Sequence, residues 1–275
     1  MAKGRRVLLG YHRVTTGHPH QIDGLRKDAK CDILWPQVGE WGRASTAAIG
    51  IVAIHQEEMG MSSQGRRLPV YLVLDTSGSM SGEPIEAVRQ GIKALLADLR
   101  GDPQALETAF LSVITFSSGA QQVCPLTELM AFQEPALDAN GSTALGAGLD
   151  LLEQCISREV RKGSTTQKGD WKPLVFLMTD GQPTDSWEGP ATRIKQARIG
   201  NIIACAAGAQ ADEAPLKRLS ETVVKLSTLQ PEALKQFFKW VSSSIKMTSQ
   251  SINQPTAGGA VNLPPAPPGV IQIVP

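Results

Sequence analysis

Between residues 67 and 248, short apolar runs alternate with segments in which apolar residues recur every three or four positions. The runs have the length and composition of buried strands, and they cover residues 68–74, 109–116, 174–179, 201–207 and 222–226. The periodic segments have the spacing of amphipathic helices, and they cover residues 83–99, 145–160, 191–199, 214–220 and 231–245. Strands and helices that alternate at this pitch predict an α/β domain with a doubly wound, mainly parallel sheet and helices on both faces.

One further segment interrupts this regular alternation. Residues 120–124 follow directly after the turn sequence Ser-Ser-Gly, and their pattern predicts one short antiparallel edge strand. The chain of 275 residues is long enough for one large α/β domain with appendages.

The composition divides the chain into three regions. Residues 1–66 contain all four histidines and show no sustained period, which indicates a poorly ordered extension or an overlong start, since Met59 and Met61 precede the first strand. A small docking segment built around Trp35 and Trp41 is the alternative. Residues 67–248 form the predicted domain. Residues 249–275 end in NLPPAPPGVIQIVP, which predicts a Pro-rich, disordered or extended tail that acts as a linker or as a polyproline ligand.

Charge and cysteine content narrow the class of protein. A formal net charge of +1 gives no reason to expect nucleic acid or an anionic membrane as the main partner. The four cysteines lack zinc-ligand spacing, so we expect buried free thiols in a reducing compartment. The sequence shows no signal peptide, and its apolar run at 44–54 is too short to span a bilayer, so the expected location is cytoplasmic without membrane insertion.

Oxygen-bearing side chains follow two of the predicted strands. Asp75, Ser77 and Ser79 come directly after the first strand, Thr143 begins a predicted helix, and Asp180 ends the strand at 174–179. Because ligands of open α/β sheets bind at the carboxyl ends of the strands, Asp75 and Asp180 should point into one crevice. Carboxylates and hydroxyls offer only oxygen, which suits a hard cation such as Mg2+.

Each of these residues also has an ordinary structural interpretation. Thr143 alone is typical of a helix cap, and Asp180 before glycine is typical of a turn. Asp185 is expected to be solvated, with adjustment of a ligand or partner as the alternative. The five residues together, in order and at strand or helix ends, favour a metal site at Asp75, Ser77, Ser79, Thr143 and Asp180.

The D-x-S-x-S sequence followed by a distant Thr and a distant Asp resembles the metal-ion-dependent adhesion site of von Willebrand factor A (vWA) domains. The resemblance implies that Ser77 and Ser79 ligate Mg2+, or Mn2+, directly. It implies that Thr143 joins directly or through water, while Asp75 and Asp180 hold coordinated waters. Mostly neutral ligands leave the ion electrophilic, so an Asp or Glu of a protein partner would complete its coordination shell.

The sequences RRLPVYLVLDTSGSM, GEPIEAVRQGI, PLVFLMTDGQPTD and IIACAAG resemble the TerY-like branch of tellurium-resistance and stress-response proteins. This resemblance implies a cytoplasmic assembly factor that works with other tellurium-resistance proteins or with a kinase and phosphatase pair.

An enzyme is the competing class, because Mg2+ in such a sheet can serve phosphoryl transfer or hydrolysis. The chain has no GxxxxGK[ST] loop, no GxGxxG after the first strand and no histidine from residue 67 onward. We therefore expect a non-enzymatic interaction module.

Overall fold

The computed structural model describes residues 66–166, 168–251 and 263–274. The prediction for residues 1–66 therefore falls, apart from Arg66, outside the described residues. No helix in the described part of the chain is both long and apolar enough to cross a membrane.

In the described part of the chain, seven strands form a single sheet in the order β3-β2-β1-β4-β5-β6-β7. Their bounds are β1 Leu68–Asp75, β2 Ala109–Phe116, β3 Ala120–Glu128, β4 Leu174–Thr179, β5 Asn201–Ala207, β6 Thr222–Leu226 and β7 Ile271–Val274. The five central strands pair in parallel, while β3 and β7 run antiparallel at the two edges. The mainly parallel sheet is confirmed, and the sheet has two antiparallel edge strands where the sequence predicted one.

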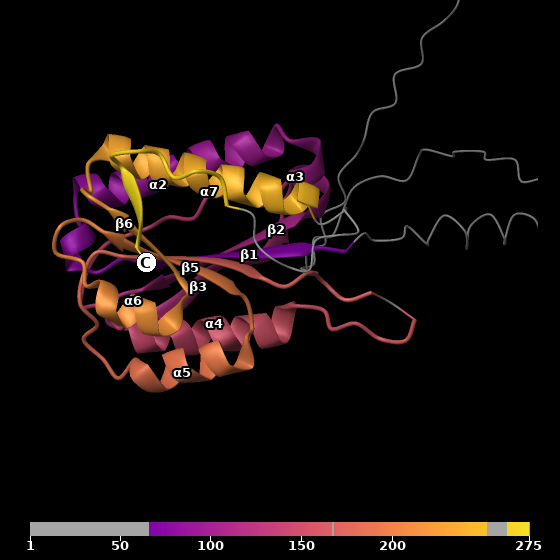
Figure 1. Cartoon of the computed structure of the whole chain (residues 1–275), viewed down its shortest axis with the longest axis horizontal. Helices are drawn as coiled ribbons and strands as arrows, with labels where there is room; N and C mark the ends of the chain where they lie inside the picture. Colours follow the sequence, from indigo (N-terminus) through magenta and orange to yellow (C-terminus); the bar gives the residue numbers. More distant parts are fainter. Residues whose placement is uncertain (1–65, 167, 252–262, 275) are drawn as a thin grey trace, which may run out of the picture. The chain divides into compact units, whose positions relative to one another are not determined.

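Helices cover both faces of the sheet, as Figure 1 shows. Their bounds are α2 Glu83–Arg100, α3 Pro103–Thr108, α4 Leu145–Glu159, α5 Glu188–Ala197, α6 Glu213–Leu219 and α7 Pro231–Ser251, with a 3-10 turn η1 at Gly78–Met80. Helices α2, α3 and α7 lie on one face, and α4, α5 and α6 lie on the other. This arrangement confirms the doubly wound fold.

Strand β1 lies in the middle of the core. Leu72 and Leu74 pack on the side of α2 and α7, while Tyr71 and Val73 pack on the side of α4. All eight residues of β1 are buried. A strand covered on both faces has no solvent side, which explains why its sequence is a continuous apolar run.

The C-terminal residues differ from the predicted disordered tail of 249–275. Helix α7 continues to Ser251, and β7 pairs with β6 in antiparallel register from Leu226↔Ile271 to Val223↔Val274. The indole Nε1 of Trp240 donates a hydrogen bond to the Pro264 carbonyl at 3.0 Å. Strand β7 satisfies the backbone groups along an edge of β6 that would otherwise be open, so part of this tail belongs to the domain.

Two short elements have no clear signal in the sequence. Helix α3 has six residues, too few to show a helical period, and it begins where the Asp102 carboxylate accepts the Ala105 N–H at 2.8 Å. The turn η1 lies between β1 and α2, in the segment that carries Ser79. The expected free thiols Cys155 and Cys205 are buried, and Cys124 is half-buried and also free.

Candidate metal centre

The predicted site lies where β1 and β4 end side by side. Strand β1 has β2 on one side and β4 on the other, so the chain reverses its direction of winding at β1 and β4. Leu74 pairs with Met178, which brings the ends of the two strands, and with them Asp75 and Asp180, to the same edge of the sheet. Such a switch point is where open α/β sheets usually bind ligands.

The carboxylate of Asp75 lies at the buried end of the site and accepts two hydrogen bonds there. Its Oδ1 accepts the Ser77 N–H at 2.8 Å, and its Oδ2 accepts the Thr179 hydroxyl at 2.6 Å. Asp75 is 0% exposed and Ser77 is 2% exposed, so this part of the site is closed to solvent. The two hydrogen bonds fix the β1 loop against the end of β4.

A chain of hydroxyls joins the β1 loop to Asp180. The Oγ atoms of Ser77 and Ser79 lie 3.0 Å apart, and Ser79 Oγ donates to Asp180 Oδ1 at 2.9 Å. Ser79 is exposed, while Asp180 is 6% exposed. The cluster therefore opens to solvent at Ser79, which is the side from which a ligand can approach.

Thr143 lies on the third segment of the site. A Cβ placed on Gly181 would stand 3.3 Å from Thr143 Oγ1, so this hydroxyl lies beside the residue that follows Asp180. The segment reaches this position because Gly141 adopts a positive φ of 75° and its carbonyl accepts the Gly78 N–H at 3.0 Å. All five predicted residues therefore gather at one edge of the sheet.

The two carboxylates are buried without a cationic partner. No ion pair in the described part of the chain involves Asp75 or Asp180. Burial raises the pKa of Asp75, and burial together with the negative charge of Asp75 raises the pKa of Asp180, although hydrogen bonds from nearby hydroxyls oppose both shifts. Two buried carboxylates without a positive charge are costly, and a bound cation would remove that cost.

The donor set suits a hard cation. The five residues supply three hydroxyl and two carboxylate groups, all oxygen. Within the described ranges, no group of three or more His, Cys, Asp and Glu side chains is arranged to hold a metal. A cation at this edge would therefore depend on hydroxyl oxygens as well as carboxylates, which favours Mg2+ or Mn2+ over a soft metal.

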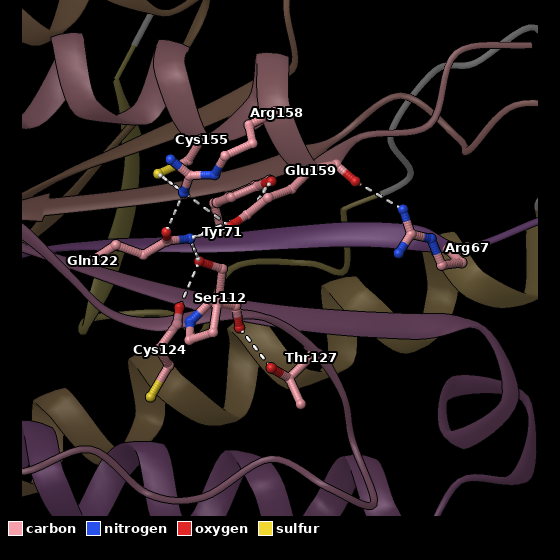
Figure 2. A network of polar contacts seen from close by, with 10 residues as sticks. Arg67, Tyr71, Ser112, Gln122, Cys124, Thr127, Cys155, Arg158 and Glu159 are labelled. Carbon is pink, nitrogen blue, oxygen red and sulfur yellow. Dashed lines mark hydrogen bonds and ion pairs between the residues drawn. The ribbon is translucent and has the colours of Figure 1, made fainter.

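Two acidic side chains near the other end of α4, Glu159 and Asp170, have cationic partners, and Figure 2 shows those of the half-buried Glu159. The Glu159 carboxylate accepts hydrogen bonds from the Tyr71 hydroxyl at 3.0 Å, from Gln122 Nε2 at 2.9 Å and from Arg158 at 3.2 Å. Near the start of β1, Asp170 pairs with Arg67 at 2.5 Å, and its side chain is 3% exposed. Each acid at this end has an arginine partner.

Two further residues contact the segments that form the site: Asp185, for which adjustment of a ligand was only the alternative prediction, and Thr184, which the sequence analysis did not single out. Asp185 was expected to be solvated, but its Oδ1 and Oδ2 accept the backbone N–H groups of Gly146 and Ala147, each at 2.9 Å. Thr184 Oγ1 accepts the Thr143 N–H at 3.2 Å, and its own N–H donates to the Thr143 carbonyl at 2.9 Å. These contacts join residues about forty positions apart in the chain, so no local sequence pattern predicts them.

Comparison with known proteins identifies partial relatives. The uncharacterized protein sll0103 of Synechocystis sp. is 37% identical over 124 residues, which cover 42% of this chain and 26% of that protein. The E3 ubiquitin-protein ligase WAVH1 of Arabidopsis thaliana is 29% identical over 132 residues, which cover 42% of this chain and 18% of that protein. The chain thus matches about a quarter or less of the length of these two curated relatives.

Solved structures share the fold at low sequence identity. A von Willebrand factor type A structure from Catenulispora acidiphila superposes with a TM-score of 0.52 at 19% identity, covering 66% of this chain and 43% of that chain. The pilus adhesin SpaC of Lactobacillus rhamnosus GG, in its open conformation, superposes with a TM-score of 0.53 at 16% identity. The match covers 66% of this chain and 30% of that chain. The family profile of the von Willebrand factor type A domain matches residues 70–239, more than half of the chain. The chain therefore belongs to the von Willebrand factor type A domain family.

Proposed function

We propose that this protein is a metal-dependent interaction module that binds a carboxylate-bearing protein partner through Mg2+ or Mn2+. Residues Asp75, Ser77, Ser79, Thr143 and Asp180 would hold the ion. When bound, the ion would supply an electrophilic site that a partner's Asp or Glu can ligate. Domains of this family generally mediate interactions between proteins, which supports an interaction role.

One observation carries the proposal. Asp75 and Asp180 are buried together, next to Ser77 and Ser79, and no lysine or arginine pairs with either carboxylate among the described residues. Elsewhere in this protein a buried acid such as Asp170 does have an arginine partner. A cation at the hydroxyl cluster would balance the two carboxylates and leave an open coordination position on the exposed side of Ser79.

The finer assignment rests on the sequence motifs. Their resemblance to the TerY-like branch supports a cytoplasmic assembly role in a bacterial tellurium-resistance or stress-response system. Its partners would be other proteins of that system or a kinase and phosphatase pair. We propose a non-enzymatic role, since the described residues around the metal centre include no histidine or cysteine that could act as a base or nucleophile.

The test is calorimetric titration with Mg2+ and with Mn2+, followed by co-purification of partners from the native host. The wild type is compared with the double substitution Ser77→Ala/Ser79→Ala and with Ser243→Ala. Ser243 is a half-buried serine of α7 whose hydroxyl donates to the Lys239 carbonyl of the same helix. We expect the double substitution to weaken metal affinity at least about tenfold and to release the partners, while Ser243→Ala changes neither. Partners that remain bound without metal would refute the bridging mechanism.

A further inference from the structure

The loop that carries Asp180 also holds the segment that carries Thr143. Residues 181–185 leave β4, and the last two of them make four hydrogen bonds, two to Thr143 and two to the first turn of α4. Thr184 bonds both the N–H and the carbonyl of Thr143, at 3.2 and 2.9 Å. The backbone of Thr143 is therefore fixed on both sides by one residue.

Asp185 anchors the helix that begins next to Thr143. Both of its carboxylate oxygens accept backbone N–H groups from the first turn of α4, where the N-cap residue Ala144 has no side chain able to do so. The positive end of the helix dipole favours a carboxylate at this place. Asp185 thus caps α4 from a segment that follows a different strand.

The sequence of α4 leaves room for this anchor. A Cβ on Gly146 would stand 2.6 Å from the Ser186 carbonyl oxygen and 2.9 Å from Asp185 Oδ2. Backbone cannot yield at so short a distance, so only glycine allows the loop after β4 to approach α4 this closely.

We propose that Thr184 and Asp185 are positioning residues of the metal centre, which fix Thr143 relative to Asp180 so that both reach one ion. This inference rests on the proposed function, because it concerns the affinity of the same site. A metal that demands near-octahedral geometry loses affinity when one ligand is displaced. Residues that orient ligands without touching the ion typically change affinity by about 10- to 100-fold.

The experiment measures Mn2+ affinity by calorimetry and the melting temperature in the presence of EDTA for full-length variants. Asp185→Ala removes the anchor, Asp185→Asn keeps one acceptor oxygen, and Thr184→Val removes only the hydroxyl that accepts the Thr143 N–H. The control is Asp212→Ala, because Asp212 caps α6 through the Ala214 N–H at 2.9 Å. Both alanine substitutions remove a helix cap, but only Asp185 contacts the segment that carries Thr143.

We expect Asp185→Ala to weaken Mn2+ binding about tenfold or more and Asp185→Asn to restore part of that loss. Thr184→Val should also weaken binding, and it provides the test if Asp185→Ala does not fold. Asp212→Ala should lower the melting temperature and leave Mn2+ affinity unchanged. If wild type binds Mn2+ and the variants at 184 and 185 bind it equally well, the positioning role is wrong and the metal centre stands. If wild type binds no Mn2+, the proposed function and this inference both fail.

Discussion

Acidic side chains shielded from solvent have different partners at the metal centre and at the opposite end of α4. Asp170 has Arg67 as its partner. Glu159 has Arg158 and also accepts hydrogen bonds from Tyr71 and Gln122, as Figure 2 shows. Among the residues that the structure describes, Asp75 and Asp180 have only hydroxyl and amide partners. The protein can therefore pair buried acids internally, and it leaves two unpaired at the edge of the sheet where an external cation would complete them.

The largest expected effect comes from breaking an internal pair. Arg67→Met leaves Asp170 buried, and among the described residues the remaining partner of its carboxylate is the Arg161 backbone N–H, at 2.8 Å. Removing one member of a buried ion pair costs about 3 kcal/mol or more of unfolding free energy. Denaturant unfolding in EDTA measures the loss, and Mn2+ affinity should be unchanged. A loss below about 1 kcal/mol would show that this end of the molecule does not depend on its paired charge.

A substitution in the metal centre should have the opposite effect on the stability of the metal-free protein. Asp180→Asn removes a buried charge that has no counter-charge, so the metal-free protein should be as stable as wild type or more stable by up to about 1 kcal/mol. The same substitution should weaken Mg2+ and Mn2+ binding at least about tenfold. Unfolding curves with EDTA and with excess metal separate the two effects. A large loss of stability in EDTA would contradict the contrast between the two ends.

Tyr71→Phe gives a smaller effect that depends on pH. The substitution removes the bond to Glu159 and should cost about 1 kcal/mol at neutral pH. Burial, with the negative charge of Glu159, raises the pKa of the Tyr71 phenol above its ordinary value of 10.0. The folded protein therefore keeps the proton while the unfolded chain loses it above about pH 10. Stability that is present below that pH should fall as the pH rises, and it should fall less steeply in Tyr71→Phe, as measured by thermal unfolding from neutral to alkaline pH.

A surface contact should show the smallest effect. Asp98 of α2 accepts hydrogen bonds from Lys246 Nζ at 2.7 Å and from the Ser242 hydroxyl, both on α7. Partial burial opposes ionisation, but these two bonds hold the pKa of Asp98 below its ordinary value. The stability that the Asp98 carboxylate contributes is therefore present at pH values above its ordinary pKa, and it is lost as the pH falls through the lowered pKa. Asp98→Asn should cost less than about 1 kcal/mol at neutral pH, because the pair is partly solvated.

Local patterns predicted most of the central fold. Strands β2, β4, β5 and β6 have the predicted bounds, because each is an apolar run limited by turn or polar residues. The five residues of the proposed metal centre were predicted as a set because Asp75, Ser77 and Ser79 follow the end of β1, Asp180 follows β4 and Thr143 lies beside a helix start. These features depend on residues close together in the sequence.

Long-range contacts account for what the sequence did not predict. Strand β7 has only four residues, and it exists because β6, more than forty residues earlier, offers an edge to pair with. Asp185 looks like a loop residue until α4 is placed beside it. Neither case has a periodic or compositional signal, because the partner that gives each its role comes from another element.

Strand β7 has a practical consequence for anyone who shortens this chain. The matched family region ends at residue 239, which would suggest a cut near the end of α7. A protein ending at residue 251 would expose the free edge of β6 and leave the indole N–H of Trp240 without its carbonyl partner. An open, apolar edge strand pairs readily with other chains, so the shortened protein should aggregate during expression. Residues 263–274 therefore protect the edge of the sheet, and a shortened protein should retain them.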